Sequence, residues 1–400
     1  MMKAFIHVQH LLGSGHIVRA VALAKALVRM GLDVTLATGN HIPDTLNCDG
    51  LTVIKLPVVR AANARFDVLL DEYNNPIDAV WWEQRISATL SAFSAEHFDL
   101  LLTETYPFGR RMFAAEMTRL LECAGSKLSP PWITCSIRDI LVRKDASWKE
   151  EWMASQATAF YDRILVHSDP QLITMEDSFP YADRVNSLVR YTGYISDDRQ
   201  SSSSSSDGMD ETIVSCGGGA VGAALLKAAL STHTHMPIGS SDRWRILVGQ
   251  DYPEDQFQHL ASHRTAQMIV ERARPDFPAL LKKAKLSISQ AGYNTVVDIL
   301  RAGVPAVLVP FAQAAETEQT QRALSLFKRG RVVAVPENVL TPETLAQAAQ
   351  KAMALAPSDL HAALNGAEVS AQILAEDLGL KPQINEPHGI IWERNISRDL

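Results

Sequence analysis

The stretch SISQAGYNTVVDILRAGVPAVLVPF, residues 287–311, contains a complete strand–turn–helix–strand pattern. A short apolar run ends at Ser289, Gly292 follows, and apolar residues then recur at helical spacing over 293–302. Gly303 and Pro305 end this helix, and a second apolar run follows at once. Two strands joined by one helix are typical of a parallel sheet, so the stretch predicts an α/β fold.

The same alternation of apolar runs and helical segments extends along the rest of the 400 residues. A chain of this length is expected to form two domains, and a six-serine run at 201–206, which has nothing to bury, separates its two halves. We therefore predict two doubly wound, Rossmann-like domains. The expected divisions are a first domain over 1–198, a Ser-rich linker or loop over 199–209, a second domain over 210–358, and a C-terminal helix and tail over 359–400 that pack back towards the first domain.

Hydrogen-bond donors gather where the 293–302 helix begins. The open N-terminus of a helix attracts anions through its unpaired N–H groups and its dipole, so a diphosphate fits there. Asp298, one turn into the helix, can accept bonds from both hydroxyls of a ribose. Tight turns and a solvated helix would explain each feature separately, but not their joint placement. The predicted nucleotide-binding residues here are Ser289, Gly292, Tyr293, Asn294, Thr295 and Asp298.

The segment after the next strand, FAQAAETEQTQR at 311–322, is rich in polar side chains at the same predicted edge of the sheet. Glu318 and Gln319 are suited to hydrogen-bond the hydroxyls of a sugar. The alternative is that these side chains only coat a solvated helix.

A second glycine corner, SCGGGAVG at 215–222, also lies between a predicted strand and a predicted helix. Gly217, Gly218 and Gly219 would bring backbone N–H groups close to a phosphate, and we assign Arg272 to the same nucleotide site. Because the corner also matches G-x-G-x-x-G, an NAD-dependent oxidoreductase using 217–222 is an alternative. Asp251 lies farther along than the usual roughly 20 residues, which weakens that alternative.

The first glycine corner is HLLGSGHIVRA, residues 10–20, between a predicted strand at 3–9 and a helix at 15–30. His16 lies in the first helical turn, at the edge of a doubly wound sheet where ligands bind. The corner alone leaves two interpretations equally open: His16 is a general base, or it caps and packs the helix. We expect Glu104 to orient the His16 ring, and Arg19 either to face a phosphate or to lie on the helix surface.

A second ligand is expected to bind this first domain. The predicted contacts are Gly13, Ser14, Gly15, Arg110 and Arg138, of which the two arginines follow predicted strands in TETYPFGRR (103–111) and CSIRDIL (135–141). Guanidinium groups bind phosphate or carboxylate in a bidentate manner, so this ligand is expected to be phosphorylated or acidic. For the neighbouring Arg111 and Asp139 we expect structural ion pairs instead.

Taken together, these motifs resemble the GT-B glycosyltransferases, and most closely family 28, which includes the N-acetylglucosaminyltransferase that forms lipid II. The resemblance rests on 287–322 and on VQHLLGSGHIVRA (8–20), TETYPFGRR, CSIRDIL, LVHSDP (165–170) and YTGY (191–194), and covers most of 1–355. It implies two facing Rossmann-like domains with a sugar donor on the second and, on the first, an acceptor that is phosphorylated, acidic or lipid-linked. His16 then falls on the candidate catalytic histidine of the family. Asp298 stands where family 28 commonly has a ribose-binding glutamate, and Glu318 where it has the first glutamine of a sugar-contacting pair.

Composition narrows the class of protein further. The net charge of −7 and the pI of about 6.0 argue against binding nucleic acid through general basicity. The four cysteines form no C-x-x-C pair, which fits a cytoplasmic protein, while peripheral membrane contact stays open. No D-x-D triplet occurs, so we expect neither a metal at the diphosphate nor any cofactor.

The sequence thus predicts an inverting, metal-independent glycosyltransferase that uses a nucleoside diphosphate sugar, UDP-linked by the resemblance. Three alternatives remain: an epimerase or hydrolase of the same fold, the NAD-dependent oxidoreductase, and an inactive sugar-nucleotide-binding module.

Overall fold

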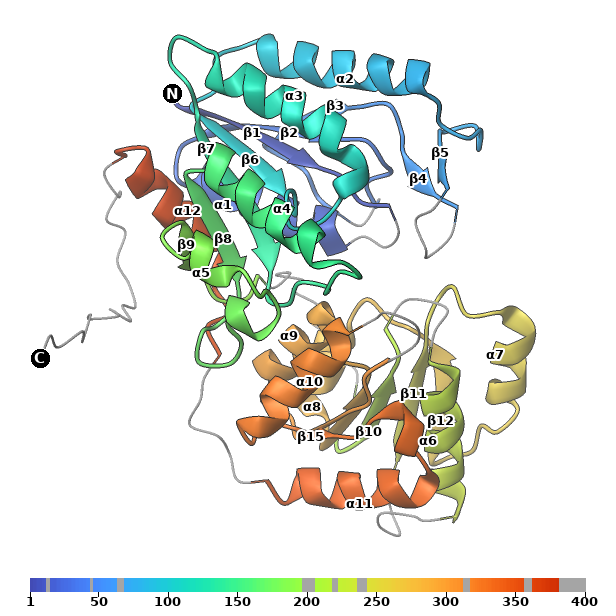
Figure 1. The fold of residues 1–400 in the computed structure, drawn as a ribbon. Helices are drawn as coiled ribbons and strands as arrows, with labels where there is room; N and C mark the ends of the chain where they lie inside the picture. Colours follow the sequence, from blue (N-terminus) through green and yellow to red (C-terminus); the bar gives the residue numbers. More distant parts are fainter. Residues whose placement is uncertain are drawn as a thin grey trace, which may run out of the picture.

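The computed structural model describes residues 1–11, 15–43, 46–62, 68–195, 206–217, 222–235, 243–311, 317–355 and 362–380. Within these ranges the chain forms two parallel sheets, each covered by helices, one above the other in Figure 1. The corner residues Gly13, Ser14, Gly218 and Gly219 lie outside the described residues. So do most of the serine run and the tail from residue 381.

The first sheet has the strand order β3-β2-β1-β6-β7-β8-β9, and all its neighbouring strands run parallel. Its strands are β1 (Lys3–Val8), β2 (Asp33–Thr38), β3 (Thr52–Lys55), β6 (Leu100–Glu104), β7 (Trp132–Arg138), β8 (Arg163–His167) and β9 (Val189–Tyr191). β4 (Arg60–Ala61) and β5 (Leu69–Leu70) form a separate hairpin.

Helices cover both faces of this sheet, so its central strands are apolar on both sides. Along β1, Phe5 packs into one core while Ala4, Ile6 and Val8 pack into another, as the alternation of side chains along a strand requires. The helices of this domain are α1 (Gly15–Arg29), α2 (Ala79–Ser94), η1 (Arg111–Phe113), α3 (Ala114–Gly125), α4 (Ser147–Phe160), η2 (Met175–Asp177) and α5 (Ala182–Val185).

The second sheet has the order β12-β11-β10-β13-β14-β15 and is also parallel. Its strands are β10 (Thr212–Ser215), β11 (Trp244–Val248), β12 (Met268–Arg272), β13 (Leu286–Ser289), β14 (Ala306–Leu308) and β15 (Val333–Ala334). Its helices are α6 (Ala223–His235), α7 (Glu254–Ala261), α8 (Phe277–Lys283), α9 (Tyr293–Ala302), α10 (Glu318–Lys328), η3 (Glu337–Val339) and α11 (Pro342–Met353).

The stretch at 287–311 folds as its sequence predicts. β13 ends at Ser289, α9 spans the expected 293–302, and Gly303 ends the helix in the left-handed conformation with φ 66°. β14 then pairs in parallel with β13, which places the start of α9 at the carboxyl edge of the second sheet.

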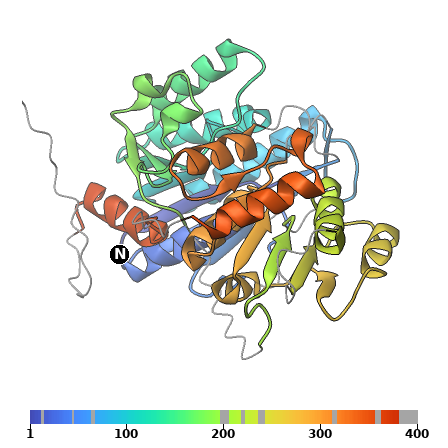
Figure 2. The same ribbon diagram turned by 90° about the horizontal axis from the view of Figure 1, so that it is seen from below.

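The chain returns to the first domain through α12 (Gly366–Asp377), which packs against α1. Figure 2 shows α12, in red, next to the blue helix α1 of the first domain, and Figure 1 shows it far from α11. Where the chain crosses back, Tyr194 and Ala363 are joined by a 2.7 Å backbone hydrogen bond, and Ile195 forms an antiparallel bridge with Asn365. The side chains of Arg163 and Asp377 then join β8 to the end of α12.

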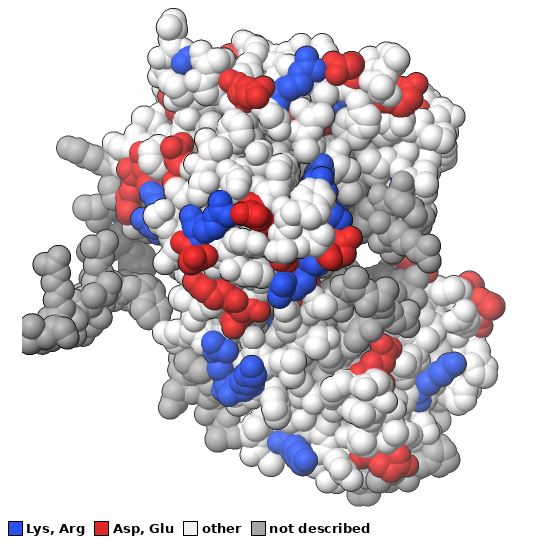
Figure 3. Space-filling view, viewed as in Figure 1, with Lys and Arg blue, Asp and Glu red and all other residues white. Residues whose placement is uncertain are grey.

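On the face shown in Figure 3, acidic and basic side chains are interspersed, and no broad region of one sign covers either domain. No helix in the described part of the chain has the length and apolarity needed to cross a membrane.

Candidate active site

The carboxyl edge of the first sheet meets the start of α9 from the second domain. A Cβ atom added to Gly15 would lie 3.7 Å from Nδ2 of Asn294. The hydroxyl of Tyr293 donates to the carbonyl of His167 at 3.2 Å and accepts from the backbone N–H of Ile195 at the same distance. The first glycine corner and the predicted nucleotide cradle are therefore neighbours in space.

The structure brings His16 and Glu104 together. Nδ1 of His16 lies 3.1 Å from Oε1 of Glu104, although 88 residues separate them in the chain. The Glu104 carboxylate is fully buried, whereas the His16 side chain keeps 13% of its surface exposed. Thr105, held in the left-handed region with φ 73°, places its hydroxyl 3.1 Å from the same ring nitrogen.

Arg19 also belongs to this cluster, and it is buried rather than on the helix surface. Its guanidinium pairs with Oε1 of Glu104 and lies 3.1 Å from Nδ1 of His16. The Arg19 guanidinium is also 5.4 Å from the ring centroid of Tyr293, within the range of a cation–π contact. A positive charge from α1 thus lies between the His16–Glu104 pair and the second domain.

Burial, with the charges of Arg19 and Arg110, lowers the pKa of His16 to about 3 despite the opposing effect of Glu104. Burial alone would raise the pKa of Glu104, but Arg19, His16 and Ser136 hold it well below its usual range. At neutral pH the pair is therefore a neutral imidazole beside an ionised carboxylate. Glu104 can only accept, so a proton on Nδ1 of His16 would serve that carboxylate and leave the lone pair of Nε2 for a substrate, whereas the Arg19 guanidinium, which can only donate, lies 3.1 Å from the same Nδ1.

In the second domain, the structure places the predicted cradle residues around the start of α9. Gly292 precedes the helix and no side chain caps it. Ser289 is buried at the end of β13 and hydrogen-bonds to Ser287, while Asn294 is exposed and both Thr295 and Asp298 are half-buried. Oε1 of Gln319 accepts from the backbone N–H groups of Ala291, at 3.0 Å, and Phe311, at 3.1 Å. Gln319 thus holds the loop on which the cradle depends.

Glu318 and Arg138, predicted for the sugar and the acceptor respectively, pair with each other at 2.6 Å across the two domains. Glu318 also pairs with Arg322 at 2.7 Å. Arg322 in turn makes two 2.7 Å bonds to the carboxylate of Asp139 and a third to the carbonyl of Ala291. A buried network of charges therefore connects the nucleotide cradle to the end of β7.

The remaining predicted residues are placed as follows. Arg272 bonds to the carbonyls of Gly249 and Tyr252, pairs with Glu254, and stacks over Phe257. Gly217 has a positive φ of 75°, and its N–H donates to Ser215. These contacts are structural, so a direct role of either residue with the nucleotide remains a prediction.

Arg110 has a left-handed backbone with φ 59° immediately before η1. Burial and the nearby charge of Arg138 lower its pKa to about 10, which indicates that cations converge here. Arg111, in contrast, stacks over Trp148 with 4.3 Å between guanidinium carbon and ring centroid. Arg110 therefore lies among other cations, where a ligand contact is predicted, whereas Arg111 lies against an aromatic ring.

Ser136, His167 and Arg322 also belong to the site, although the sequence motifs did not predict them as site residues. All three are buried at the meeting point of the domains, and their contacts join residues between 25 and 183 positions apart. The available signal for Ser136 and His167 was their position in strands that reach the site, in CSIRDIL and LVHSDP, whereas Arg322 lies within α10 at the end of FAQAAETEQTQR.

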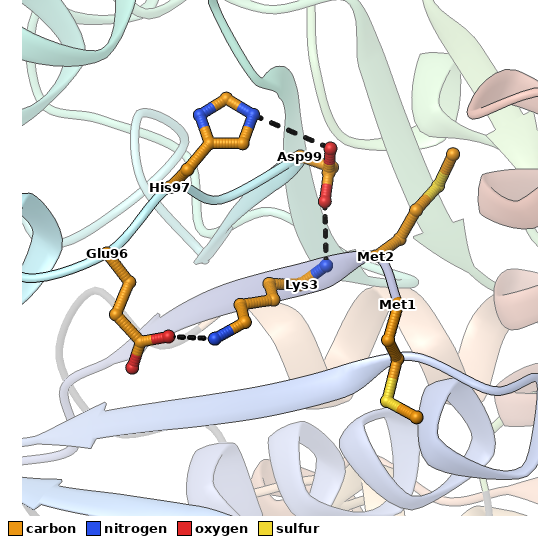
Figure 4. A pocket seen from close by; sticks show the side chains of 6 residues that line it. All are labelled: Met1, Met2, Lys3, Glu96, His97 and Asp99. Carbon is orange, nitrogen blue, oxygen red and sulfur yellow. Dashed lines mark hydrogen bonds and ion pairs between the residues drawn. The ribbon is translucent and has the colours of Figure 1, made fainter.

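A surface hollow also occurs at the opposite, amino-terminal edge of the first sheet, lined by Met1, Met2, Lys3, Glu96, His97 and Asp99 (Figure 4). The Lys3 ammonium pairs with Glu96, and the Lys3 backbone N–H donates to Asp99. Its location separates it from the site above. Among the described residues, no group of three or more His, Cys, Asp or Glu is arranged to hold a metal ion.

Residues 213–376 match the family model of the glycosyltransferase family 28 C-terminal domain. The chain is 32% identical over 144 residues to a UDP-N-acetylglucosamine--N-acetylmuramyl-(pentapeptide) pyrophosphoryl-undecaprenol N-acetylglucosamine transferase of Synechococcus sp. (strain JA-2-3B'a(2-13)), covering 32% of this chain and 37% of that one. A protein of the same name from Thermotoga neapolitana is 39% identical over 72 residues, or 18% of this chain and 21% of the other. These curated relatives are thus matched over well under half of their own length.

Solved structures are similar over nearly the whole chain. Acinetobacter baumannii MurG aligns with a TM-score of 0.59 and 16% identity, covering 94% of this chain and 99% of that one. A UDP-glucosyltransferase from Polygonum tinctorium aligns with a TM-score of 0.60 and 12% identity, covering 95% and 99%. These similarities confirm the predicted fold class, GT-B.

Proposed function

We propose that this chain, a family 28-like member of the GT-B glycosyltransferases, is an inverting transferase that moves a sugar from a nucleoside diphosphate sugar to an acceptor hydroxyl. The observation that carries the proposal is the buried His16–Glu104 pair beside the uncapped start of α9. A base and an anion-binding helix terminus from opposite domains are the two parts that such a reaction requires.

The donor would lie on the second domain. Its diphosphate would bind the N–H groups at the start of α9 and those near Gly217, and Asp298 would accept bonds from the ribose hydroxyls. The names of the curated relatives specify UDP-N-acetylglucosamine, which supports a UDP-linked donor here. Glu318 and Gln319 would face the sugar, with Glu318 introducing a charge beside its hydroxyls.

The reaction would use the neutral form of His16. As the acceptor oxygen forms its bond to the anomeric carbon, Nε2 of His16 takes the hydroxyl proton, and the bond from that carbon to the diphosphate oxygen breaks with inversion. Glu104 stabilises the imidazolium that results, and the helix terminus stabilises the departing diphosphate. The transition state would resemble an oxocarbenium ion.

The acceptor would approach from the first domain, past Gly15. Arg110 and its neighbouring cations would favour an acceptor with a phosphate or carboxylate, and the relatives' names support a lipid-linked diphosphate. Arg138 already pairs with Glu318, so its contact with an acceptor would require that pair to open.

The transferase explains these observations better than its alternatives. An epimerase or hydrolase would not need the acceptor contacts proposed for the first domain. An oxidoreductase would need its nicotinamide near Gly217 rather than beside His16. The named curated relatives are both transferases, which favours transfer.

The test is release of the nucleotide from a panel of UDP-, GDP- and dTDP-sugars, measured with and without lipid and polar acceptor extracts. Acceptor-dependent release that is lost in His16→Ala and kept in His97→Ala is expected, because His97 lies at the opposite edge of the sheet. Equal release without any acceptor would instead indicate a hydrolase.

Activity is also expected to need no divalent metal, because helix N–H groups would stabilise the diphosphate. Dialysis against EDTA should leave the turnover number unchanged. Loss of turnover that Mg²⁺ or Mn²⁺ restores would contradict this part of the proposal.

A further inference from the structure

A row of buried polar side chains continues behind Glu104, away from His16. The Ser136 hydroxyl donates to Oε2 of Glu104 at 2.7 Å and lies 2.8 Å from Nε2 of His167. Nδ1 of His167 is in turn 2.8 Å from the hydroxyl of Thr192. All four side chains are buried.

Chemistry allows one order of protons along this row. Glu104 is ionised and can only accept, so Ser136 must give it its single hydroxyl proton. The Ser136 oxygen then accepts from Nε2–H of His167, and in a neutral ring Nδ1 of His167 accepts from Thr192, for whose hydroxyl proton the Gly193 carbonyl at 3.0 Å competes. Burial lowers the pKa of His167 to about 3, so this ring is neutral and fits the order with one proton.

The row ends at a contact between the domains. The backbone carbonyl of His167 accepts from the hydroxyl of Tyr293, the first residue of α9. His167 therefore touches the carboxylate network through its ring and the nucleotide-binding helix through its backbone. The charged groups that face the His16–Glu104 pair are Arg19 from α1 and Arg110 from the segment before η1.

We propose that Ser136 and His167 are positioning residues, whose fixed proton order holds the Glu104 carboxylate and thereby sets the tautomer and basicity of His16. Glu104 has one oxygen for His16 and Arg19 and the other for Ser136, so Ser136 determines how the carboxylate is oriented. The role in catalysis rests on the function proposed above, whereas the effect on the His16 ring does not.

The first test uses NMR of ring nitrogens in ¹⁵N-histidine-labelled protein, with His16 assigned from the His16→Gln variant. In the wild-type protein we expect His16 to be protonated on Nδ1 alone. Ser136→Ala removes a donor from Glu104, so the carboxylate attracts an imidazolium more strongly. The His16 titration midpoint should then rise by about half a pH unit or more, and the two neutral tautomers should mix.

Conservative variants separate positioning from packing. Ser136→Thr keeps the hydroxyl and His167→Gln keeps an N–H donor, so both should preserve the His16 tautomer, while His167→Met should not. Ser370→Ala is the matched control, because it removes another buried serine hydroxyl, on α12, without touching this network. If His167→Met does not fold, Ser136→Ala alone decides the question.

Kinetics give the second readout. Misplacing the base should lower kcat by up to about 10²-fold in Ser136→Ala, while KM for the donor changes only a few-fold. The acid limb of its kcat profile should move to higher pH, together with the NMR midpoint. An unchanged His16 tautomer and midpoint in folded Ser136→Ala would overturn the inference. If the NMR data are unchanged but the wild-type enzyme is active, only this inference is wrong and the proposed function stands. If the NMR data change as expected but the wild-type protein transfers no sugar, the proposed function is wrong and the inference about the His16 ring stands.

Discussion

At the scale of single residues, the site depends on which groups are charged. His16 would be positively charged in part of the molecules at pH 6.5 if it were exposed, but burial beside Arg19 keeps it neutral. Glu104 remains ionised because Arg19 compensates its buried charge. The site therefore combines a neutral imidazole with a carboxylate able to stabilise the proton that the imidazole gains.

We predict that His16→Ala lowers kcat about 10²–10⁴-fold, the range expected for loss of a general base. The donor Kd should change only a few-fold, because the donor would lie mainly on the other domain. With the pKa of His16 near 3, the imidazole stays unprotonated between pH 8 and pH 5, so wild-type kcat should not fall over this range through protonation of the base. Steady-state kinetics and donor titration check this, and a near-wild-type kcat would make His16 a packing residue.

Asp298 should control nucleotide affinity. Asp298→Ala is expected to weaken UDP binding by about 1.5–3 kcal/mol, the contribution of hydrogen bonds to a charged group. Calorimetric titration of UDP measures the loss, with Asp255→Ala on the exposed face of α7 as the control. If affinity is the same in Asp298→Ala and wild type, the ribose contact proposed for this carboxylate does not exist.

At the scale of elements, α10 joins the predicted nucleotide cradle to the first domain. Arg322 of α10 is fully buried and bonds to Asp139, to Glu318 and to the carbonyl beside Gly292. The printed sequence could not predict this network, because Asp139 and Arg322 are 183 residues apart and either could have remained solvated. Its local pattern did predict β13, α9 and β14, because the glycine and proline residues that separate these elements are their direct neighbours in the sequence.

The same contrast applies to the candidate site. His16 and Glu104 were predictable because each lies at the carboxyl end of a strand or the helix after it. Their partner Ser136 looks like any strand residue until β6 and β7 are paired with Glu104 opposite Ser136. Position along a strand is thus visible in sequence, while pairing across strands and domains is decided by tertiary packing.

We predict that Arg322→Met destabilises the protein strongly, by about 3–5 kcal/mol, because it leaves Asp139 and Glu318 buried without their common partner. Arg29→Met, which breaks the exposed pair with Glu368, should cost at most about 1 kcal/mol. Urea denaturation followed by circular dichroism compares the two. Similar losses in both variants would show that the buried network contributes no more than a surface ion pair.

At the scale of the whole molecule, two passages of the chain between the domains lie against each other. One runs through Gly193 and the other through Gly366, where a Cβ atom would lie 2.4 Å from the carbonyl oxygen of Gly193. The carbonyl of Gly193 is a backbone group, so this contact could not be relieved by changing a side-chain rotamer. This close approach lets α12 reach α1 and fastens the end of the chain to the domain in which it began.

Gly366→Ala should therefore separate the two passages and release α12 from α1. We expect a loss of about 1–3 kcal/mol, typical of overpacking, with increased hydrogen exchange over 366–377 and in the facing residues of α1. Gly125→Ala is the matched control, since a Cβ atom there meets nothing within 4 Å. Because α1 also carries His16 and Arg19, release of α12 should lower kcat as well as stability, whereas a tightly held α12 in Gly366→Ala would mean that the crossing tolerates a side chain.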